Sequence, residues 1–273
     1  QPPPAVYYIY FPASQLSAAT EAQQPPINVS GGRVVIDLSH SNMVSWWDLD
    51  ALLAKLAELN FTASFVDSWA RVERELANAT SLIIAAPTKP YGEEEVRRVA
   101  DFTARGGMLL LLFDPSYEYL GSEGLRNFVV APINTLSSKF GITFTYGYLY
   151  NDKEYYGIYR NIYVRDFANV SIFRNVKTLV LFTASAVRTS HAAAWTSNTT
   201  FLMSAEKPGT YGVVAYLRWG NGTVVALGDI TIFSEPYCHV EDNYVFISNL
   251  AELIAQASPA KGRAEQKLEK PNL

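Results

Sequence analysis

The sequence predicts an α/β fold in which a mainly parallel sheet carries helices on both faces. Between residues 33 and 113, short runs of strand type alternate with segments of helical periodicity. The strand-type runs are apolar throughout, as expected for strands that are buried on both faces. Repeated strand–helix units connect parallel strands through right-handed crossovers, which places helices on the two sides of the sheet.

The first predicted strand, residues 33–37, leads into the most polar turn of the chain. A run of β-branched residues ends at Asp37, and Ser39, His40, Ser41 and Asn42 follow before a helical pattern begins at Trp46. In open α/β sheets, ligands bind outside the carboxyl ends of the strands. This stretch therefore predicts the position of a site as well as the first strand.

The next elements continue the alternation. Helices are predicted over residues 46–60, 70–77 and 91–105, and strands over residues 61–66, 81–86 and 108–113. Gly106 and Gly107 are expected to end the third helix, because glycine commonly follows the last helical turn. A further helix is predicted within residues 122–140 and ends at Gly141.

From residue 142 onward the pattern changes. Residues 142–150 and 155–164 are rich in tyrosine and roughly alternate in polarity, which is typical of antiparallel hairpins. We interpret about 143–200 as a Tyr-rich β insertion or edge subdomain. Further strands are predicted at 178–182, 201–204, 211–219 and 223–227, with a hairpin turn at Gly220-Asn221-Gly222, before a final helix over about 243–256.

Two extended segments flank the predicted domain, which covers residues 33–257. Residues 1–32 form a Pro/Tyr-rich extended arm in which residues 5–11 have strong strand propensity. A strand on such an arm needs a sheet edge for pairing, either the edge of its own domain or that of a neighbour. Residues 258–273 are a polar, lysine-rich tail that we interpret as a stalk, a linker or a docking arm.

Composition predicts the compartment. The net charge of −4 does not favour nucleic acid or an anionic membrane surface, and a single cysteine allows no internal disulfide. Six Asn-x-Ser/Thr sequons occur where chance predicts about two, so we expect N-linked glycans on a secreted or surface-displayed protein whose signal peptide was removed before Gln1. Surface glycoproteins without disulfides are more usual in archaea and bacteria than in animals, so we expect an archaeal protein. The alternative is that polar loops happen to be rich in Asn and Thr. The sequon asparagines are Asn28, Asn60, Asn78, Asn169, Asn198 and Asn221.

Four segments together resemble a known family. They are 34–37 with His40 and Asn42, 83–87 followed by 93–95, 104–107 with the strand that ends at Asp114, and 225–229 with Asp242 and Asn243. Over about 33–140 and 211–256 the chain resembles the DUF4350-type family and GldG-like extracytoplasmic domains of the class I glutamine amidotransferase-like fold. The resemblance implies a flavodoxin-like three-layer α/β sandwich.

The chain departs from true amidotransferases at the nucleophile. Those enzymes carry a cysteine in a glycine-flanked elbow after a central strand, whereas the corresponding stretch here is Phe113-Asp114-Pro115-Ser116, and Cys238 lies far downstream. Glutamine hydrolysis is therefore not expected. By analogy, members of this fold that lack the nucleophile are usually binding or scaffold domains.

Polar residues at the ends of the predicted elements are candidates for ligand binding. Together they could bind a sugar, a peptide end or a divalent cation. The alternative is that the aspartates only cap nearby loops and helices. The candidates are Asp37, His40, Asn42, Asp114, Ser116, Asp229, Asp242 and Asn243.

Two catalytic arrangements have weaker support. A hydrolase would need Ser116 with His40 or His239, oriented by Asp229, but no Gly-x-Ser-x-Gly elbow is present. A zinc site from His40, His239 and Asp229 lacks local ligand spacing. No glycine-rich phosphate loop occurs, and we expect neither a cofactor nor a bound metal.

These features favour a non-enzymatic extracytoplasmic glycoprotein. We expect an interaction or scaffold domain of a cell-surface or membrane-associated assembly, in which the arm of residues 1–32 and the Tyr-rich insertion contact other protein subunits. The first alternative is an extracellular domain that binds a small ligand, and the second is a degenerate hydrolase that uses Ser116 and His40.

Overall fold

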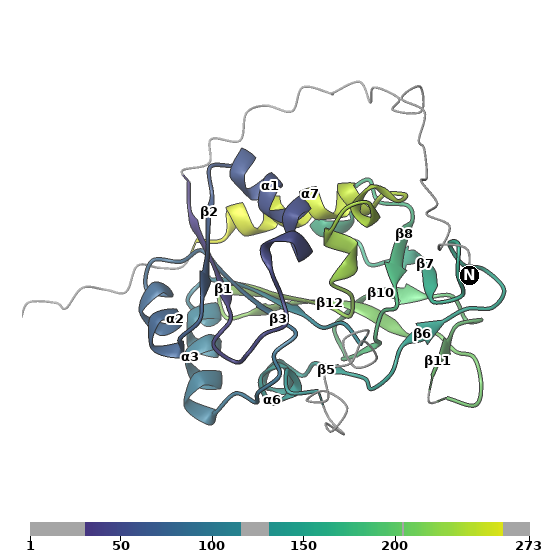
Figure 1. The fold of residues 1–273 in the computed structure, drawn as a ribbon, viewed down its shortest axis with the longest axis horizontal. Helices are drawn as coiled ribbons and strands as arrows, with labels where there is room; N and C mark the ends of the chain where they lie inside the picture. Colours follow the sequence, from purple (N-terminus) through teal and green to yellow (C-terminus); the bar gives the residue numbers. More distant parts are fainter. Residues whose placement is uncertain (1–30, 116–130, 204, 259–273) are drawn as a thin grey trace, which may run out of the picture.

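One nine-stranded sheet runs through the molecule (Figure 1). The computed structural model describes residues 31–115, 131–203 and 205–258, so the predictions for the arm up to residue 30, for Asn28, for Ser116 and for the tail from residue 259 lie outside the described residues. The strand order is β2-β1-β3-β4-β13-β12-β10-β7-β8.

The first half of this sheet is parallel, which confirms the α/β prediction. Each strand of this half is paired in parallel with its neighbour. The strands are β1 (Arg33–Asp37), β2 (Thr62–Val66), β3 (Ser81–Ala85), β4 (Met108–Leu112) and β13 (Gly222–Leu227). Of these, β13 comes late in the chain yet pairs along the length of β4, with Thr223 opposite Met108 and Leu227 opposite Leu112.

The second half continues the same sheet with antiparallel pairs. Its strands are β12 (Gly212–Trp219), β10 (Ala192–Thr196), β7 (Asn161–Phe167) and β8 (Leu179–Phe182). The Tyr-rich segment, interpreted from sequence as an insertion or edge subdomain, therefore extends the edge of the central sheet and forms no separate sheet of comparable size. Two small sheets flank it, β5 (Thr143–Phe144) with β9 (Val187–Arg188) and β6 (Leu149–Tyr150) with β11 (Phe201–Leu202).

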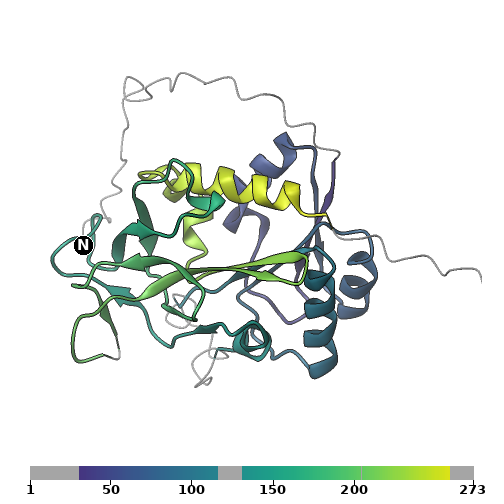
Figure 2. The ribbon, with the colours of Figure 1, turned by 180° about the vertical axis from the view of Figure 1, so that it is seen from behind.

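Helices cover both faces of the parallel half. On one face lie α1 (Asp50–Glu58) and α7 (Asn243–Gln256), and on the other lie α2 (Trp69–Glu75), α3 (Glu93–Ala104) and α6 (Asn134–Ser137) (Figures 1 and 2). Consecutive residues of β1 serve opposite faces, because Val34 and Ile36 pack into the cluster under α1 and α7 whereas Val35 packs into the cluster under α2 and α3. This arrangement explains why the strands read as continuous apolar runs.

The hairpin between β12 and β13 requires glycine at two positions. Gly220 has a φ of +59°, and a Cβ at Gly222 would lie 2.0 Å from the carbonyl oxygen of Thr103 in α3. The predicted Gly-Asn-Gly turn is therefore confirmed, and its second glycine also lets β13 pass close to the end of α3.

Some elements differ from the predictions. The predicted helix over 46–60 is divided into a 3-10 turn, Trp46–Asp48, and α1, which begins at Asp50. The predicted helix within 122–140 appears as α6 followed by a 3-10 turn, Ser138–Phe140, and it ends at Gly141 as expected, while residues 122–130 are not described. Among the described helices, none combines the length and the apolar character that crossing a bilayer requires.

Candidate functional site

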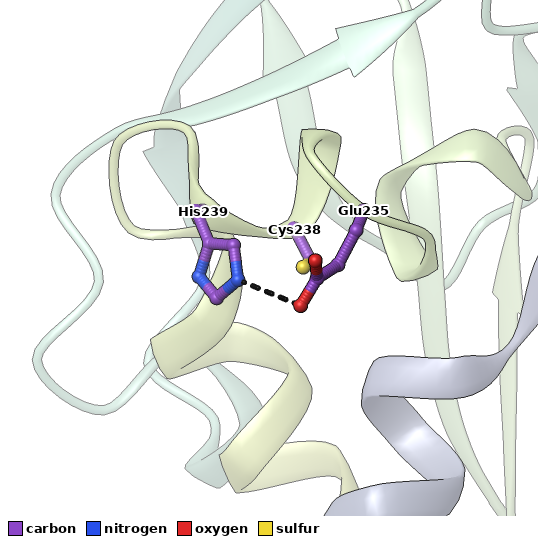
Figure 3. A group of neighbouring side chains, drawn as sticks. All are labelled: Glu235, Cys238 and His239. Atoms are coloured by element: carbon purple, nitrogen blue, oxygen red, sulfur yellow. Dashed lines mark hydrogen bonds and ion pairs between the residues drawn. The ribbon is translucent and has the colours of Figure 1, made fainter. Parts of the chain in front are cut away.

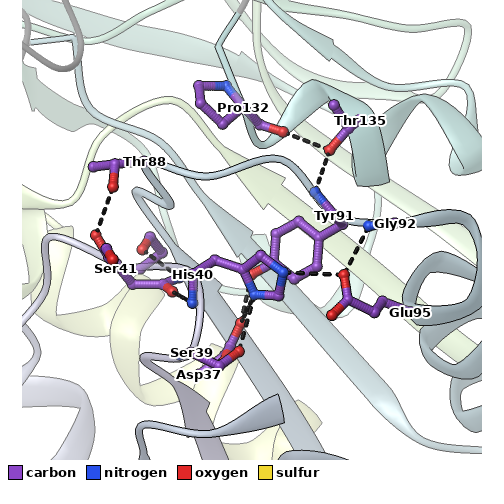
Figure 4. A network of polar contacts seen from close by, with 12 residues as sticks. Asp37, Ser39, His40, Ser41, Thr88, Tyr91, Gly92, Glu95, Pro132 and Thr135 are labelled. Carbon is purple, nitrogen blue, oxygen red and sulfur yellow. Dashed lines mark hydrogen bonds and ion pairs between the residues drawn. The ribbon is translucent and has the colours of Figure 1, made fainter.

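At the carboxyl end of β1, His40 lies between two carboxylates (Figure 4). Its Nδ1 is 3.4 Å from Oδ2 of Asp37, and its Nε2 is 3.1 Å from Oε2 of Glu95 at the start of α3. Asp37 is fully buried and also accepts hydrogen bonds from the backbone N of Ser39 (2.8 Å), the Ser39 hydroxyl (2.6 Å) and the Tyr91 hydroxyl (2.5 Å). Asp37 and His40 are thus brought together, as the sequence predicts.

The charges of this cluster stabilise one another. Burial alone would raise the pKa of Asp37, but hydrogen bonds from His40, Ser39 and Tyr91 outweigh burial and hold this pKa below its usual range. Burial alone would lower the pKa of His40, but its hydrogen bond to Asp37, and then Glu95, outweigh burial and raise this pKa. When His40 is protonated, its imidazolium donates from both nitrogens and bridges the two carboxylates.

Ser39 and Glu95 connect this bridge to its surroundings. The Ser39 hydroxyl lies 2.9 Å from Nδ1 of His40 and donates to Oδ1 of Asp37 at 2.6 Å. Both ring nitrogens of His40 have carboxylate neighbours, and the contact with Glu95 links the start of α3 to the end of β1.

The sequence assigns no role to three members of the cluster, which are Ser39, Tyr91 and Glu95. Tyr91 stacks on the His40 ring with centroids 3.7 Å apart. Glu95 also accepts a hydrogen bond from the backbone N of Gly92 at 2.7 Å, which caps α3. That capping pattern, with Glu three residues after the N-cap, was the sequence signal that could have identified Glu95.

Asn42 fixes the same turn to the neighbouring strand. Its Oδ1 accepts a hydrogen bond from the backbone N of His40 at 3.1 Å, and its Nδ2 donates to the carbonyl of Ala85 at 3.0 Å. Both ends of the amide are therefore used within the fold. Asn42 belongs to the structure that holds His40 in place.

A second group lies at the ends of β4 and β13. Oδ2 of Asp114 accepts hydrogen bonds from the backbone N of Ile230 (3.3 Å) and the hydroxyl of Thr231 (3.1 Å). Asp229 is fully buried, and burial followed by the negative charge of Asp114 raises the pKa of Asp229 well above its usual range. Burial and the neighbouring carboxylate of Asp114 thus both disfavour the charged form of Asp229.

The third group protects the outer edge of the sheet. Strand β8 is an edge strand, so every second backbone N–H points away from its partner β7. Three side-chain oxygens accept from these groups. They are Asp242 from Thr178 (2.9 Å), Asn243 from Val180 (3.0 Å) and Asp229 from Phe182 (2.7 Å).

Of these three side chains, Asn243 makes hydrogen bonds to both the N–H and the C=O of one residue of β8. Its Nδ2 also donates to the carbonyls of Val180 and Tyr237, each at 3.0 Å, so the amide bonds to β8 as a neighbouring strand would. Asp242 precedes α7 but makes no side-chain bond to the helix, so it serves the edge strand and not the helix cap that the sequence allowed. Asp242 and Asn243 therefore do not join Asp37 and His40 in one site.

The structure corrects the proposed zinc ligands. Among the residues that are described, the one group of three metal-type donors is Glu235, Cys238 and His239, with donor atoms within 4.8 Å of one another (Figure 3). His40 and Asp229 are engaged elsewhere and do not accompany His239. Asp229 accepts from Phe182, and His40 contacts Asp37 and Glu95, so Asp229 does not orient His40; Ser116 lies outside the described residues.

The group around Cys238 is better described as a hydrogen-bonded pair of side chains beside a buried thiol. Nε2 of His239 lies 3.3 Å from Oε1 of Glu235, and both side chains are largely exposed. Burial, followed by the charges of Glu235 and Asp50, raises the pKa of the Cys238 thiol to about 11. Zinc binds the thiolate, so a metal ion would have to displace this proton and separate His239 from Glu235.

Alkylation should test this description of Cys238. At pH 8 we expect a small thiol reagent to modify the folded protein at least roughly 200-fold more slowly than the urea-unfolded chain, because a pKa of about 11 leaves little thiolate. The chain has a single cysteine, so intact mass against time reports on this thiol alone. Equal rates in the folded and unfolded chains would contradict the buried, protonated thiol.

Every sequon asparagine in the described residues is exposed. Asn60, Asn78 and Asn221 precede β2, β3 and β13, and Asn169 follows β7, which runs in the opposite direction. These four asparagines therefore lie at the end of the sheet where the parallel strands begin. Asn198 follows β10 and lies at the opposite end, where the parallel strands finish.

Comparisons with known proteins concern the fold alone. No family model matches the sequence, and a comparison with curated proteins finds no match. The mmIFT52 N-terminal domain is similar with a TM-score of 0.64 at 18% identity, covering 82% of this chain and 98% of that chain. A ThuA-like protein from Bacteroides uniformis is similar with a TM-score of 0.54 at 10% identity, covering 86% and 96%.

Proposed function

We propose that the chain is a non-enzymatic extracytoplasmic glycoprotein that acts as an interaction or scaffold domain in a cell-surface or membrane-associated assembly. The observation that carries this proposal is the separation of two kinds of surface. Four of the five described sequons lie where the parallel strands begin, whereas exposed aromatic side chains lie where these strands end, after β1 and before β7, at the same end as Asn198.

The aromatic surface lies around the carboxyl ends of the parallel strands. Trp46 and Trp47 follow β1 and are 62% and 55% exposed. Tyr155, Tyr156 and Tyr159 precede β7, which is antiparallel to β13, so they lie at the same edge. Exposed tryptophan and tyrosine are enriched at protein interfaces, whereas glycans keep a surface free of close contacts.

The polar clusters support the same proposal against both alternatives. A ligand site needs polar atoms that converge on an open space, and a hydrolase needs a free base. The side chains of Asp37, His40 and Asn42 are bonded within the turn, and those of Asp242 and Asn243 are bonded to β8. The small-ligand domain and the degenerate hydrolase are therefore less well supported than the scaffold.

We also infer a flavodoxin-like three-layer arrangement of the DUF4350-type and GldG-like kind. Helices on both faces of the parallel strands support this inference, as does the likeness in fold to the ThuA-like protein. The absence of a cysteine elbow after β4 accords with a member of this fold that has no amidotransferase activity.

The test is the state of the protein isolated from the surface of its own cells. We expect glycopeptide mass spectrometry to find glycans at Asn60, Asn78, Asn169 and Asn221, and light scattering to give a mass well above that of one chain. Tyr155→Ser/Tyr159→Ser should reduce the assembly to smaller species. The matched pair Arg97→Ser/Arg98→Ser, exposed on α3, should not. Unmodified sequons would refute the glycoprotein, and a wild-type monomer would refute the scaffold.

A further inference from the structure

The two outer strands of the central sheet, β8 and β2, differ in whether their outward backbone groups are hydrogen-bonded. The β8 edge is covered, because its outward N–H groups bond to side chains of Asp242, Asn243 and Asp229. The opposite edge is β2, which follows α1 and, among the strands that the structure describes, pairs with β1 alone. An uncovered edge is a template for pairing with another strand.

Register identifies the open groups of β2. The N of Thr62 donates to the carbonyl of Gly32, and the carbonyl of Val66 accepts from Leu38, so residues 62, 64 and 66 bond toward β1. The backbone groups of Ala63 and Phe65 therefore point away from β1. Within the described ranges, these groups have no hydrogen-bond partner.

Strand β2 also lacks the devices that usually protect an edge. Its sequence, Thr-Ala-Ser-Phe-Val, has no charge, no proline and no glycine, and its pairing with β1 is regular. Natural edges are blunted by lysine, proline or bulges, or they are covered. The side chain of Phe65 remains only partly buried, on the face that α1 covers.

We propose that residues 5–11 of the same chain, Ala-Val-Tyr-Tyr-Ile-Tyr-Phe, add as a further strand to the outer edge of β2. This segment has strong strand propensity and no charge. Both sets of alternating residues, those that would face one side of the sheet and those that would face the other, are apolar or aromatic. Such a strand is compatible with an outer position in a sheet that has α1 on one face and α2 on the other.

The connection reaches easily within one chain. A Cβ at Gly31 would lie 2.4 Å from the carbonyl oxygen of Asn60, so the chain enters β1 directly beside the start of β2. The added strand lies two strand spacings from β1, or about 10 Å. Residues 12–30 span up to about 60 Å when extended. A tethered segment at such short range has a millimolar effective concentration, which favours its own edge over that of a second copy.

Hydrogen exchange on the full chain tests the proposal. We expect the amides of Ala63 and Phe65 to be protected, and to exchange on the order of 100-fold faster when residues 1–12 are deleted. The outward amides of Val180 and Phe182 are the internal control, because their acceptors belong to the described fold and should protect them equally in both proteins.

A second variant keeps the chain at full length. In Tyr8→Pro/Ile9→Pro one of the two prolines removes a ladder N–H in either register, so the same loss of protection is expected at Ala63 and Phe65. Fast exchange of these amides in the wild type would overturn the proposal. Protection that appears only in a dimer, and is lost on dilution to monomer, would also overturn it by assigning the edge to a second copy.

Discussion

Replacing Asn243 with alanine should destabilise the fold by about 3–5 kcal/mol, the largest effect that we expect of a single change at the sheet edge. The side chain is fully buried and makes hydrogen bonds to the N and O of Val180 and to the O of Tyr237. Alanine leaves the buried N and O of Val180 without this partner and also removes the bond to the O of Tyr237. Urea unfolding of the two proteins measures the loss.

The same change should also make the protein associate. Without Asn243, the outward backbone groups of β8 lack their side-chain partner, so molecules in which this edge opens can pair through it as open edge strands do. The matched control is Asn249→Ala on the same helix, because Asn249 donates to the carbonyls of Ile172 and Arg174, neither of which belongs to an edge strand. We expect the control to lose about 2 kcal/mol and to remain as dispersed as the wild type. Equal association of both variants would contradict the edge-protection role.

Replacing Asp37 with alanine should cost a similar amount, about 3–5 kcal/mol, because it removes one partner of a buried charge pair. The change leaves the buried Tyr91 hydroxyl without its acceptor and His40 with Glu95 alone. Asp67→Ala is the control. Its carboxylate is 77% exposed and forms an ion pair with Arg71 at 3.4 Å, so its loss should cost under about 1 kcal/mol.

The pH dependence of stability separates the charge bridge from simple packing. The folded pKa of Asp37 is lowered, so its contribution is present above about pH 3.9 and is lost as the pH falls through the folded pKa. The folded pKa of His40 is raised, so its contribution is full below about pH 6.5 and is lost as the pH rises through the folded pKa. We expect wild-type stability to be greatest between these limits. In Asp37→Ala the free energy of unfolding should fall less steeply toward both low and high pH. An Asp37→Ala variant with the wild-type pH dependence would contradict the bridge.

The strands and helices that local pattern determines were predicted closely. Strand β1 and helix α7 have the predicted bounds, because each combines a strong apolar pattern with polar residues at its ends. Strand β10 was not predicted. It begins with three alanines, which have low strand propensity, and only its neighbours β12 and β7 make it a strand.

The site was less predictable than the fold, because its contacts join distant parts of the chain. Asp37 and His40 are neighbours in sequence, so their contact could be predicted, whereas Glu95 reaches His40 from α3. Asp242 and Asn243 read as polar residues before a helix, and nothing local shows that β8 needs acceptors along its outer edge. Which polar residue serves a strand edge depends on strand order, and strand order is a property of the whole sheet.

The late position of β13 makes the domain indivisible. The parallel strands β3 and β4 are complete by Leu112, but the partner on the other side of β4 is residues 223–227. Until that hairpin is made, β4, with the sequence Met-Leu-Leu-Leu-Leu, is an apolar edge. A chain leaving the ribosome therefore holds this apolar strand open for more than a hundred residues of synthesis. Truncation just before Gly222 would remove the strand that joins β4 to β12, and the two halves of the sheet would have no strand between them.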